Sequence, residues 1–294
     1  MNKIIRLIKN IKFLSKFVLK EKIPVWNYEE IVENILYYIP TSNIVRPKVF
    51  DKEETLDALL NGEDSIARFG DGELMLIEGQ SIPYQEYDEK LAKRMKDILY
   101  NSQNHLMVGI NYSYFYPKYD SSTNKLSKDF QLFGVPKCRS ILNRLINFDI
   151  QYYDSGFTGF SDTNTKDFFD KLRSIWNNKK IFIIGCKEAN DDLKFNIYDN
   201  AKQIDYFFCP NKHAWKEYDK IIKSCKKYDK KTIIILMCGP TGKVLASDLT
   251  KEGYRSLDLG HIAKAYDYYC RNIPYTADNV FKFFSIDESI KHEK

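Results

Sequence analysis

The sequence predicts an α/β protein whose mostly parallel sheet is covered by helices on both faces, with further helices at the N-terminus. Short, continuous apolar runs such as 180–184 and 232–237 alternate with helix-length amphipathic segments, a pattern typical of strands buried on both faces. With 294 residues, of which 44% are hydrophobic and 29% charged, the chain can bury a large core. Without repeats or low-complexity linkers, it is expected to form one domain over 51–294 after a helical extension over 1–50.

Caps and breakers set the expected elements in chain order. Asp51 is a helix-capping residue and Gly62 a stop signal, so a helix is predicted between them. The same reasoning predicts helices over 28–38, 51–60, 87–100, 136–147, 164–176, 211–227, 244–251 and 261–271. Strands are predicted over 65–69, 105–110, 180–184, 203–209, 232–237 and 254–259. Segment 111–131, rich in Tyr, Ser, Asn and Lys, is expected to be irregular.

Residues 3–20 form an amphipathic pattern with apolar side chains on one helical face and Arg or Lys on the other. Such a helix either lies on an anionic membrane surface or packs on protein, including a second subunit in an oligomer. No run in 1–22 is long enough for a signal-peptide core or a membrane span. We therefore expect a cytoplasmic protein, with peripheral contact at the inner face of the plasma membrane as one of the two alternatives.

Charge and cysteine usage narrow the function classes. The net charge of +5 comes partly from the N-terminal segment, and no basic cluster interleaved with aromatic residues indicates nucleic-acid binding. The six cysteines contain no CxxC pair, and three directly follow apolar runs. This pattern indicates free, buried thiols in a reducing compartment, and the four scattered histidines argue against a histidine metal centre.

The segment 65–73 carries the most informative motif. If it is extended, Asp71 and Glu73 leave the same side of the backbone and present hard oxygen donors suited to Mg²⁺ or Mn²⁺. Gly70 permits a sharp turn and close approach of a ligand, and Arg68 can bind a phosphate or carboxylate. The alternative is a solvated Asp-Gly turn whose Glu starts a helix.

A second motif, 238–243, joins an apolar run to a helix. Gly239, Thr241, Gly242 and Lys243 could bind a diphosphate through helix-start N–H groups and a nearby ammonium. A tight strand-to-helix connection explains the same residues equally well, and the spacing is not that of a Walker loop. Gly185 lacks the other glycines of a dinucleotide fingerprint, which argues against NAD binding.

The remaining polar candidates also follow predicted strands. His261 could contact a phosphate or sugar hydroxyl or act as a base, although a hydrogen-bonded structural histidine is the commoner case. Asp258, Asp248 and His261 are candidates for the base with no order among them. Asn190 and Pro210 could line a ligand site beyond two further strands, or serve only as turn and cap residues.

Taken together, the motifs 68–73, 190–191, 199–202, 209–210, 239–241 and 258–262 resemble the bacterial GT-D-type glycosyltransferases over roughly 51–269. The resemblance implies a Rossmann-like fold, a nucleotide-sugar donor, usually a UDP-sugar, and a divalent metal held by Asp71 and Glu73. Two features depart from the family pattern. Ala263 and Ala265 stand where the family tends to have Asp and Glu, and the segment after Ile184 lacks the expected acidic-glycine start.

The expected function is therefore metal-dependent transfer of a sugar to a bacterial surface glycan or glycoprotein, with a lipid-linked or protein acceptor. Ala263 and Ala265 motivate an alternative, a catalytically silent protein that binds nucleotide sugars or acts as a scaffold. A Rossmann-like methyltransferase is a weaker alternative.

Overall fold

The computed structural model describes residues 36–37, 43–117, 134–187 and 193–284. Eight strands form one sheet in which every paired strand is parallel. They are β1 (Lys48–Val49), β2 (Ser65–Arg68), β3 (Leu106–Ile110), β4 (Gln151–Asp154), β5 (Lys180–Gly185), β6 (Gln203–Phe208), β7 (Ile233–Met237) and β8 (Ser256–Asp258). Their order across the sheet is β1-β4-β3-β2-β8-β7-β5-β6. Strands β1 to β4 form one half of the sheet and β5 to β8 the other, and the order of the strands reverses where β2 pairs with β8.

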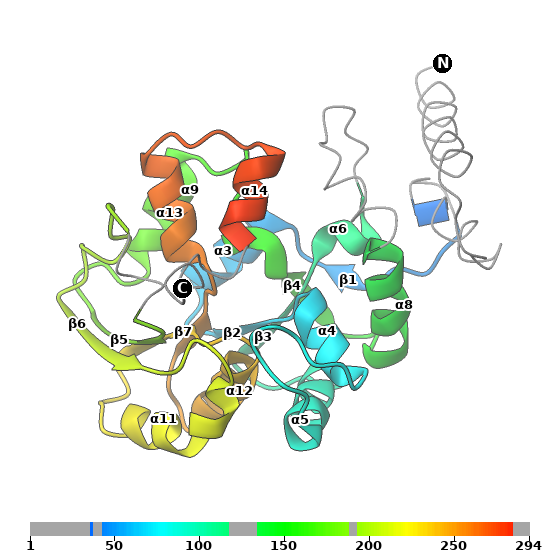
Figure 1. Cartoon of the computed structure of the whole chain (residues 1–294), viewed down its shortest axis with the longest axis horizontal. Helices are drawn as coiled ribbons and strands as arrows, with labels where there is room; N and C mark the ends of the chain where they lie inside the picture. The colour runs from blue at the N-terminus through cyan, green and yellow to red at the C-terminus, as the bar shows by residue number, and fades with distance from the viewer. Residues whose placement is uncertain (1–35, 38–42, 118–133, 188–192, 285–294) are drawn as a thin grey trace, which may run out of the picture.

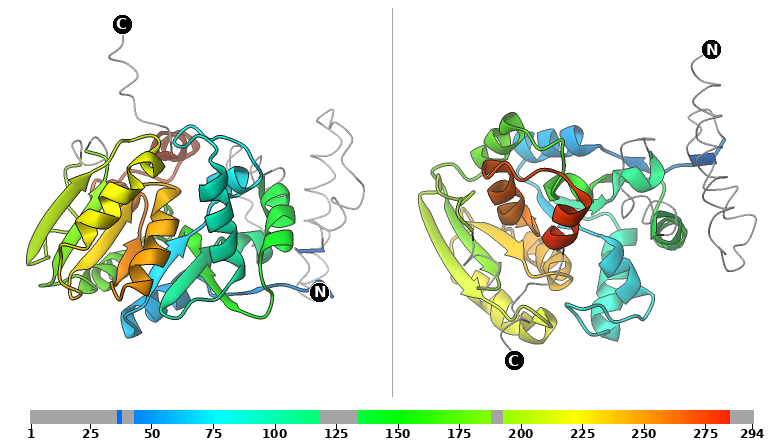
Figure 2. Two further views of the ribbon diagram at one scale, coloured as in Figure 1. Left: turned by 90° about the horizontal axis from the view of Figure 1, so that it is seen from below. Right: turned by 45° about the horizontal axis from the view of Figure 1, so that its top comes forward.

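Helices cover both faces of this sheet (Figures 1 and 2). One face carries α4 (Asp71–Ile77), α5 (Glu89–Tyr100), α8 (Val135–Leu145), α11 (Tyr218–Cys225) and α12 (Thr241–Lys251). The other carries α3 (Lys52–Asn61), α9 (Lys166–Ser174), α13 (Ile262–Cys270) and α14 (Ala277–Phe284). The short α6 (Tyr112–Phe115), η2 (Ser155–Thr158) and η3 (Ala214–Glu217) complete the described elements. Each face has its own hydrophobic core, and these two cores hold the sheet between them.

The sequence explains these elements locally. Residues 181–185 of β5 are all buried, as are the first four residues of β7, because helices lie on both sides of these strands. Asp51 caps α3 by accepting from the N–H groups of Glu53 and Glu54, while the side chain of Glu54 accepts from the Asp51 N–H. The predicted parallel α/β fold is confirmed, and so is the convergence of strand ends at one edge.

Several predicted boundaries are wrong. The sheet begins at β1, before residue 51, and β1, β4, α6 and α14 were not predicted. The predicted helix over 211–227 starts only at η3, after His213 adopts a left-handed conformation with φ 60°. The basic helix over 3–20 and most of the helix over 28–38 lie outside the described residues.

The six cysteines, all within the described residues, form no disulfide, and five of them are buried, as expected for structural thiols. Among the described helices, none is both long enough and apolar enough to span a membrane.

Candidate active site

The candidate site lies at the carboxyl ends of β2 and β8, where the sheet order reverses and where parallel α/β sheets usually bind ligands. Arg68 ends β2 and Asp258 ends β8. The Arg68 backbone N–H donates to Asp258 Oδ2 at 3.0 Å, and its guanidinium donates to the Asp258 carbonyl at 2.6 Å. A third bond runs from Arg68 Nη1 to the Ser155 carbonyl at 2.8 Å. Arg68 is thus fixed between three strand ends.

Gly260 is required by this arrangement. Its φ is +51°, a conformation that L side chains rarely adopt. A Cβ atom at this position would lie 2.2 Å from Arg68 Nη2. Only glycine therefore lets the backbone pass the Arg68 guanidinium.

Beneath Arg68, three charged side chains form a buried ion cluster. Lys243 Nζ lies 2.9 Å from Glu73 Oε1 and 3.2 Å from Asp258 Oδ2, and it donates to the Gly239 carbonyl at 3.1 Å. Burial opposes the charge on Lys243, but Asp258 and Glu73 outweigh it, so the pKa of Lys243 is raised. Lys243 is committed to these partners, and its predicted contact with a diphosphate is not supported by this geometry.

The acidic motif is helical, so the prediction of an extended segment is wrong. Gly70 is the N-cap of α4, and Asp71 and Glu73 occupy its first turn. Glu73 Oε2 accepts from the Gly70 N–H at 2.9 Å, which caps the helix from its third position. The two carboxylates therefore have different surroundings, because Glu73 is buried and Asp71 is exposed.

Asp71 is the carboxylate that a ligand can reach. Desolvation by the surrounding protein, and then the charge of Glu73, raise the pKa of Asp71. A cation beside Asp71 would relieve both effects.

Within the described residues, no group of three or more His, Cys, Asp or Glu side chains could hold a metal ion. Both oxygens of Glu73 already have partners, whereas Asp71 offers hard donors on an exposed surface. Mg²⁺ commonly binds through one or two carboxylates and completes its shell with water and substrate phosphates. The residues fit such a shared site, with Asp71 as the direct ligand and Glu73 behind it.

The start of α12 retains part of the predicted anion site. Gly239 is exposed with φ +55°, and the N–H groups of Gly242 and Lys243 bond back to the carbonyls of Gly239 and Pro240. The Thr241 hydroxyl is fully buried and has no hydrogen-bond partner. Thr241 is therefore the residue of this turn with unused hydrogen-bonding capacity.

His261 precedes α13 at the same edge. Its side chain has exposed surface, but the protein surrounds it closely. Desolvation, followed by the charges of Arg68 and Lys264, lowers the pKa of His261 to about 4. The imidazole is therefore neutral at pH 7.

A family model described as the glycosyltransferase GT-D fold matches residues 66–280. The chain belongs to this family. The resemblance inferred from the motifs is thus confirmed, and the matched region contains all the site residues above.

Relatives and solved structures agree with this assignment. The chain is 30% identical to "Probable glycosyl transferase Gly" of Streptococcus gordonii, over 75% of this chain and 33% of the relative. It is 31% identical to "Glycosyltransferase GlyD" of Streptococcus pneumoniae serotype 4, over 77% and 28% respectively. The chain therefore spans about a third or less of these relatives.

The structure described as "A New Glycosyltransferase (DUF1792) from Streptococcus sanguinis" is 26% identical with a TM-score of 0.71, covering 84% of this chain and 97% of that chain. A second is described by the words "The highly conserved domain of unknown function 1792 has a distinct glycosyltransferase fold". It is 27% identical with a TM-score of 0.72 and covers 88% of this chain and 95% of that chain.

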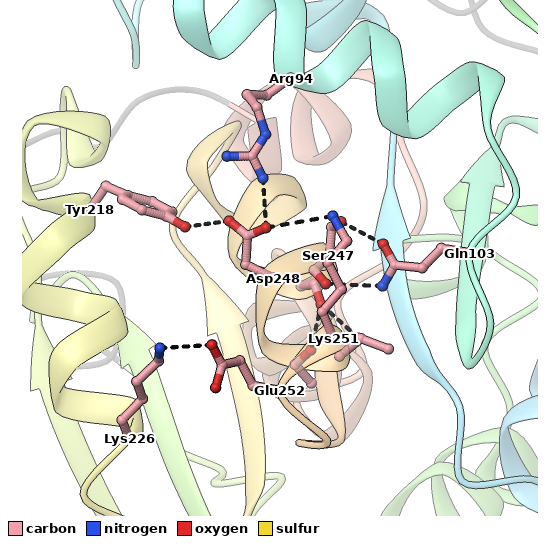
Figure 3. A network of polar contacts seen from close by, with 11 residues as sticks. Arg94, Gln103, Tyr218, Lys226, Ser247, Asp248, Lys251 and Glu252 are labelled. Carbon is pink, nitrogen blue, oxygen red and sulfur yellow. Dashed lines mark hydrogen bonds and ion pairs between the residues drawn. The ribbon is translucent and has the colours of Figure 1, made fainter.

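One candidate base of this GT-D domain lies away from the site. Asp248 is seven residues into α12, about 10 Å along the helix from Thr241. Figure 3 shows its carboxylate between the Arg94 guanidinium, at 2.6 Å, and the Tyr218 hydroxyl. Asp248 therefore joins α12 to α5 and α11, and this position does not support a role as the base. Asp258 is at the site but is 1% exposed and fully engaged, so it positions Arg68 and Lys243.

Pro210 and Asn190 do not join the site as described. Pro210 follows β6, which is three strands from β8 and so about 14 Å across the sheet. Asn190 lies outside the described residues.

Three residues near the site were missed at the sequence level. Ser155 follows β4, a strand that was not predicted, and its carbonyl holds Arg68. The side chains of Tyr114 and Cys138 are hydrogen-bonded to each other, and both interact electrostatically with Asp71. Desolvation first, and then Asp71, raise the pKa of Cys138 to about 11. No motif marks these residues, because their role depends only on packing.

Proposed function

We propose that this GT-D domain transfers a sugar from a nucleotide-sugar donor, a UDP-sugar by analogy with the family, in a metal-dependent reaction. The supporting observation is the cluster of Arg68, Lys243, Glu73 and Asp258 at the sheet reversal, with Asp71 exposed beside it. These charged side chains are held in place by one another, and they lie at the edge of the sheet where α/β folds bind nucleotides.

Charge supports the metal. Arg68 and Lys243 are cationic, whereas Asp71, Glu73 and Asp258 are acidic, and His261 is neutral. These side chains together leave one net negative charge, which would repel a diphosphate. A Mn²⁺ or Mg²⁺ ion at Asp71 would reverse that sign and neutralise the charge that develops on the departing nucleoside diphosphate.

His261 is our proposed base or hydrogen-bond acceptor for the acceptor hydroxyl. Among the three candidate bases, Asp248 and Asp258 are engaged in ion pairs, whereas His261 is exposed and uncharged at pH 7. A neutral imidazole can take a proton from a hydroxyl that approaches a sugar carbon.

The acceptor and the location are proposals that rest on the sequence and the family. We propose a growing bacterial surface glycan or glycoprotein as acceptor, either lipid-linked or on a protein. The basic amphipathic pattern over 3–20 is consistent with a cytoplasmic enzyme held peripherally at the inner face of the plasma membrane.

The alternative of a silent scaffold gains no support from Ala263 and Ala265. Both side chains are buried in α13 against the core, 5% and 0% exposed. An acid at either position would face that core. No observation favours a methyltransferase.

The test is calorimetric titration of UDP with and without Mn²⁺. We expect UDP to bind the wild-type protein in a Mn²⁺-dependent manner, and Asp71→Asn to abolish that dependence. Asp149→Asn is the matched control, because Asp149 is exposed and lies outside the site. Equal Mn²⁺-dependent affinity in wild-type protein and Asp71→Asn would contradict the assignment of Asp71 as the metal ligand.

A further inference from the structure

A separate pocket of about 270 Å³ lies between the loop before α9 and the end of α13. Its volume is slightly below the ~300–1,000 Å³ of pockets for drug-sized ligands, so a small ring system is the size of ligand that it fits. The lining combines aromatic rings with short polar side chains: Phe160, Tyr269, Tyr275, Asp162, Asn164 and Asn272.

The chemistry of this lining favours a neutral, hydroxyl-rich ring. Aromatic faces cover the apolar C–H face of a sugar, while amides and carboxylates bond its hydroxyl groups. The lining itself includes one carboxylate, Asp162, and no cationic side chain, and the neighbouring Lys52 ammonium is bonded to Asn164.

The pocket is held in shape before any ligand binds. Lys52 Nζ donates to Asn164 Oδ1 at 2.6 Å, and the Asn164 amide donates to the Gly159 carbonyl at 2.9 Å. The ring of Tyr275 packs against that of Phe160 with their centroids 5.3 Å apart, yet Tyr275 remains 42% exposed. The pocket is thus lined by one buried ring, that of Phe160, and one exposed ring, that of Tyr275.

Two connections join this pocket to the candidate site. The centroid of the Phe283 ring lies 5.8 Å from the centroid of the His261 ring and 5.5 Å from that of the Phe160 ring. Helix α13 also begins next to His261 and ends at the pocket, and Tyr269 is eight residues, or about 12 Å, from His261. A ligand in the pocket is therefore near the reacting position but does not occupy it.

The pocket and the proposed donor groups belong to opposite faces of the sheet. Asp71 and Thr241 start α4 and α12, on one face, whereas α9, α13 and α14 lie on the other (Figure 1). His261 lies between them at the carboxyl edge. Because the proposed donor groups occupy the face of α4 and α12, the pocket on the face of α13 is available to the acceptor.

We infer that this pocket binds a sugar residue of the acceptor glycan, distant from the hydroxyl that receives the new sugar. This inference rests on the proposed function, because it takes the donor to bind at Asp71. It assigns carbohydrate, rather than lipid or protein, as the part of the acceptor that this pocket recognises.

The test is saturation-transfer NMR with methyl glycosides of glucose, galactose, N-acetylglucosamine and rhamnose as probes. Tyr275→Ala removes the exposed ring. Asn272→Gly removes an amide while keeping the left-handed backbone, since Asn272 has φ 52° and glycine tolerates it. Tyr87→Ala is the matched control, because Tyr87 is exposed to almost the same degree, 43%, and lies outside the pocket. Thermal melts verify that each variant is folded.

We expect at least one glycoside to bind the wild-type protein and Tyr87→Ala, and to bind the two pocket variants roughly five- to tenfold more weakly. Binding of UDP with Mn²⁺ should be the same in all four proteins. No glycoside binding to the wild-type protein, or equal binding to all variants, would overturn the inference. Loss of UDP binding in the pocket variants would overturn it too, since the pocket would then hold the nucleoside. If UDP fails to bind the wild-type protein while glycosides still bind through the pocket, the proposed donor site fails and the carbohydrate pocket stands.

Discussion

Replacing Lys243 by Met tests the buried ion cluster most directly. The side chain of Lys243 is 7% exposed, and those of its partners Glu73 and Asp258 are 12% and 2% exposed. Methionine fills a similar volume but leaves the two carboxylates without their shared cation. The variant therefore isolates the electrostatic contribution from the packing contribution.

The expected loss is large. Removing one partner of a buried ion pair typically destabilises a protein by about 3–5 kcal/mol, because the remaining charge is buried without compensation. Each kcal/mol lowers the melting temperature of a domain of this size by about 2–4 °C. We therefore expect Lys243→Met to melt about 6–20 °C below wild type.

Differential scanning fluorimetry measures this shift, and Lys251→Met is the matched control. Lys251 is on the same helix but is 59% exposed and 3.8 Å from its carboxylate, so its loss should change stability by less than about 1 kcal/mol. If Lys243→Met melts within about 2 °C of wild type at pH 7, the cluster does not stabilise the fold as argued.

Three further outcomes follow from the site. Asp71→Asn should have a higher melting temperature than wild type at pH 7, because the raised pKa of Asp71 means that the fold disfavours the ionised carboxylate. This difference in melting temperature should vanish in acid, where Asp71 is protonated. A metal-free Asp71→Asn protein that melts below wild type would contradict this. In an NMR titration, the His261 ring should protonate with a midpoint near pH 4. Protonation of His261 should therefore lower transfer activity only as the pH approaches 4. A midpoint near 6.5 would refute the argument. Gly260→Ala should cost at least about 1–2 kcal/mol in urea unfolding, because of its left-handed backbone and the collision with Arg68, and an unchanged midpoint would show that the loop can move.

The fold could be predicted from the sequence because buried parallel strands have a strong local signature. β5 and β7 are uninterrupted apolar runs, and a capping residue and a stop signal bound α3. The missed strands β1 and β4 are short, and β4 alternates buried and half-buried residues within a polar sequence. Their pairing depends on neighbours distant in the chain, which no local pattern reveals.

The site was predicted less well, because its residues are sorted by contacts and not by type. Asp71 and Glu73 look equivalent in the sequence, but Glu73 is the third residue of α4 and reaches back to Gly70. A glutamate three residues after a glycine could have signalled this cap, which was the alternative of a helix start. The partner of Lys243 on β8 is 15 residues away, and its partner on α4 is 170 residues away, so the sequence offered no sign that this lysine is paired.

The contrast among the three candidate bases shows how the fold assigns chemical roles. The carboxylates of Asp248 and Asp258 are each held by cationic side chains, so both are committed to partners within the protein. For His261, desolvation first and then the charges of Arg68 and Lys264 lower the pKa to about 4, so at pH 7 the imidazole is uncharged, the state in which it can accept a proton. The positive charges near His261 are offset by the carboxylates of Glu73 and Asp258, so in our proposal a diphosphate needs the cation at Asp71 in order to bind.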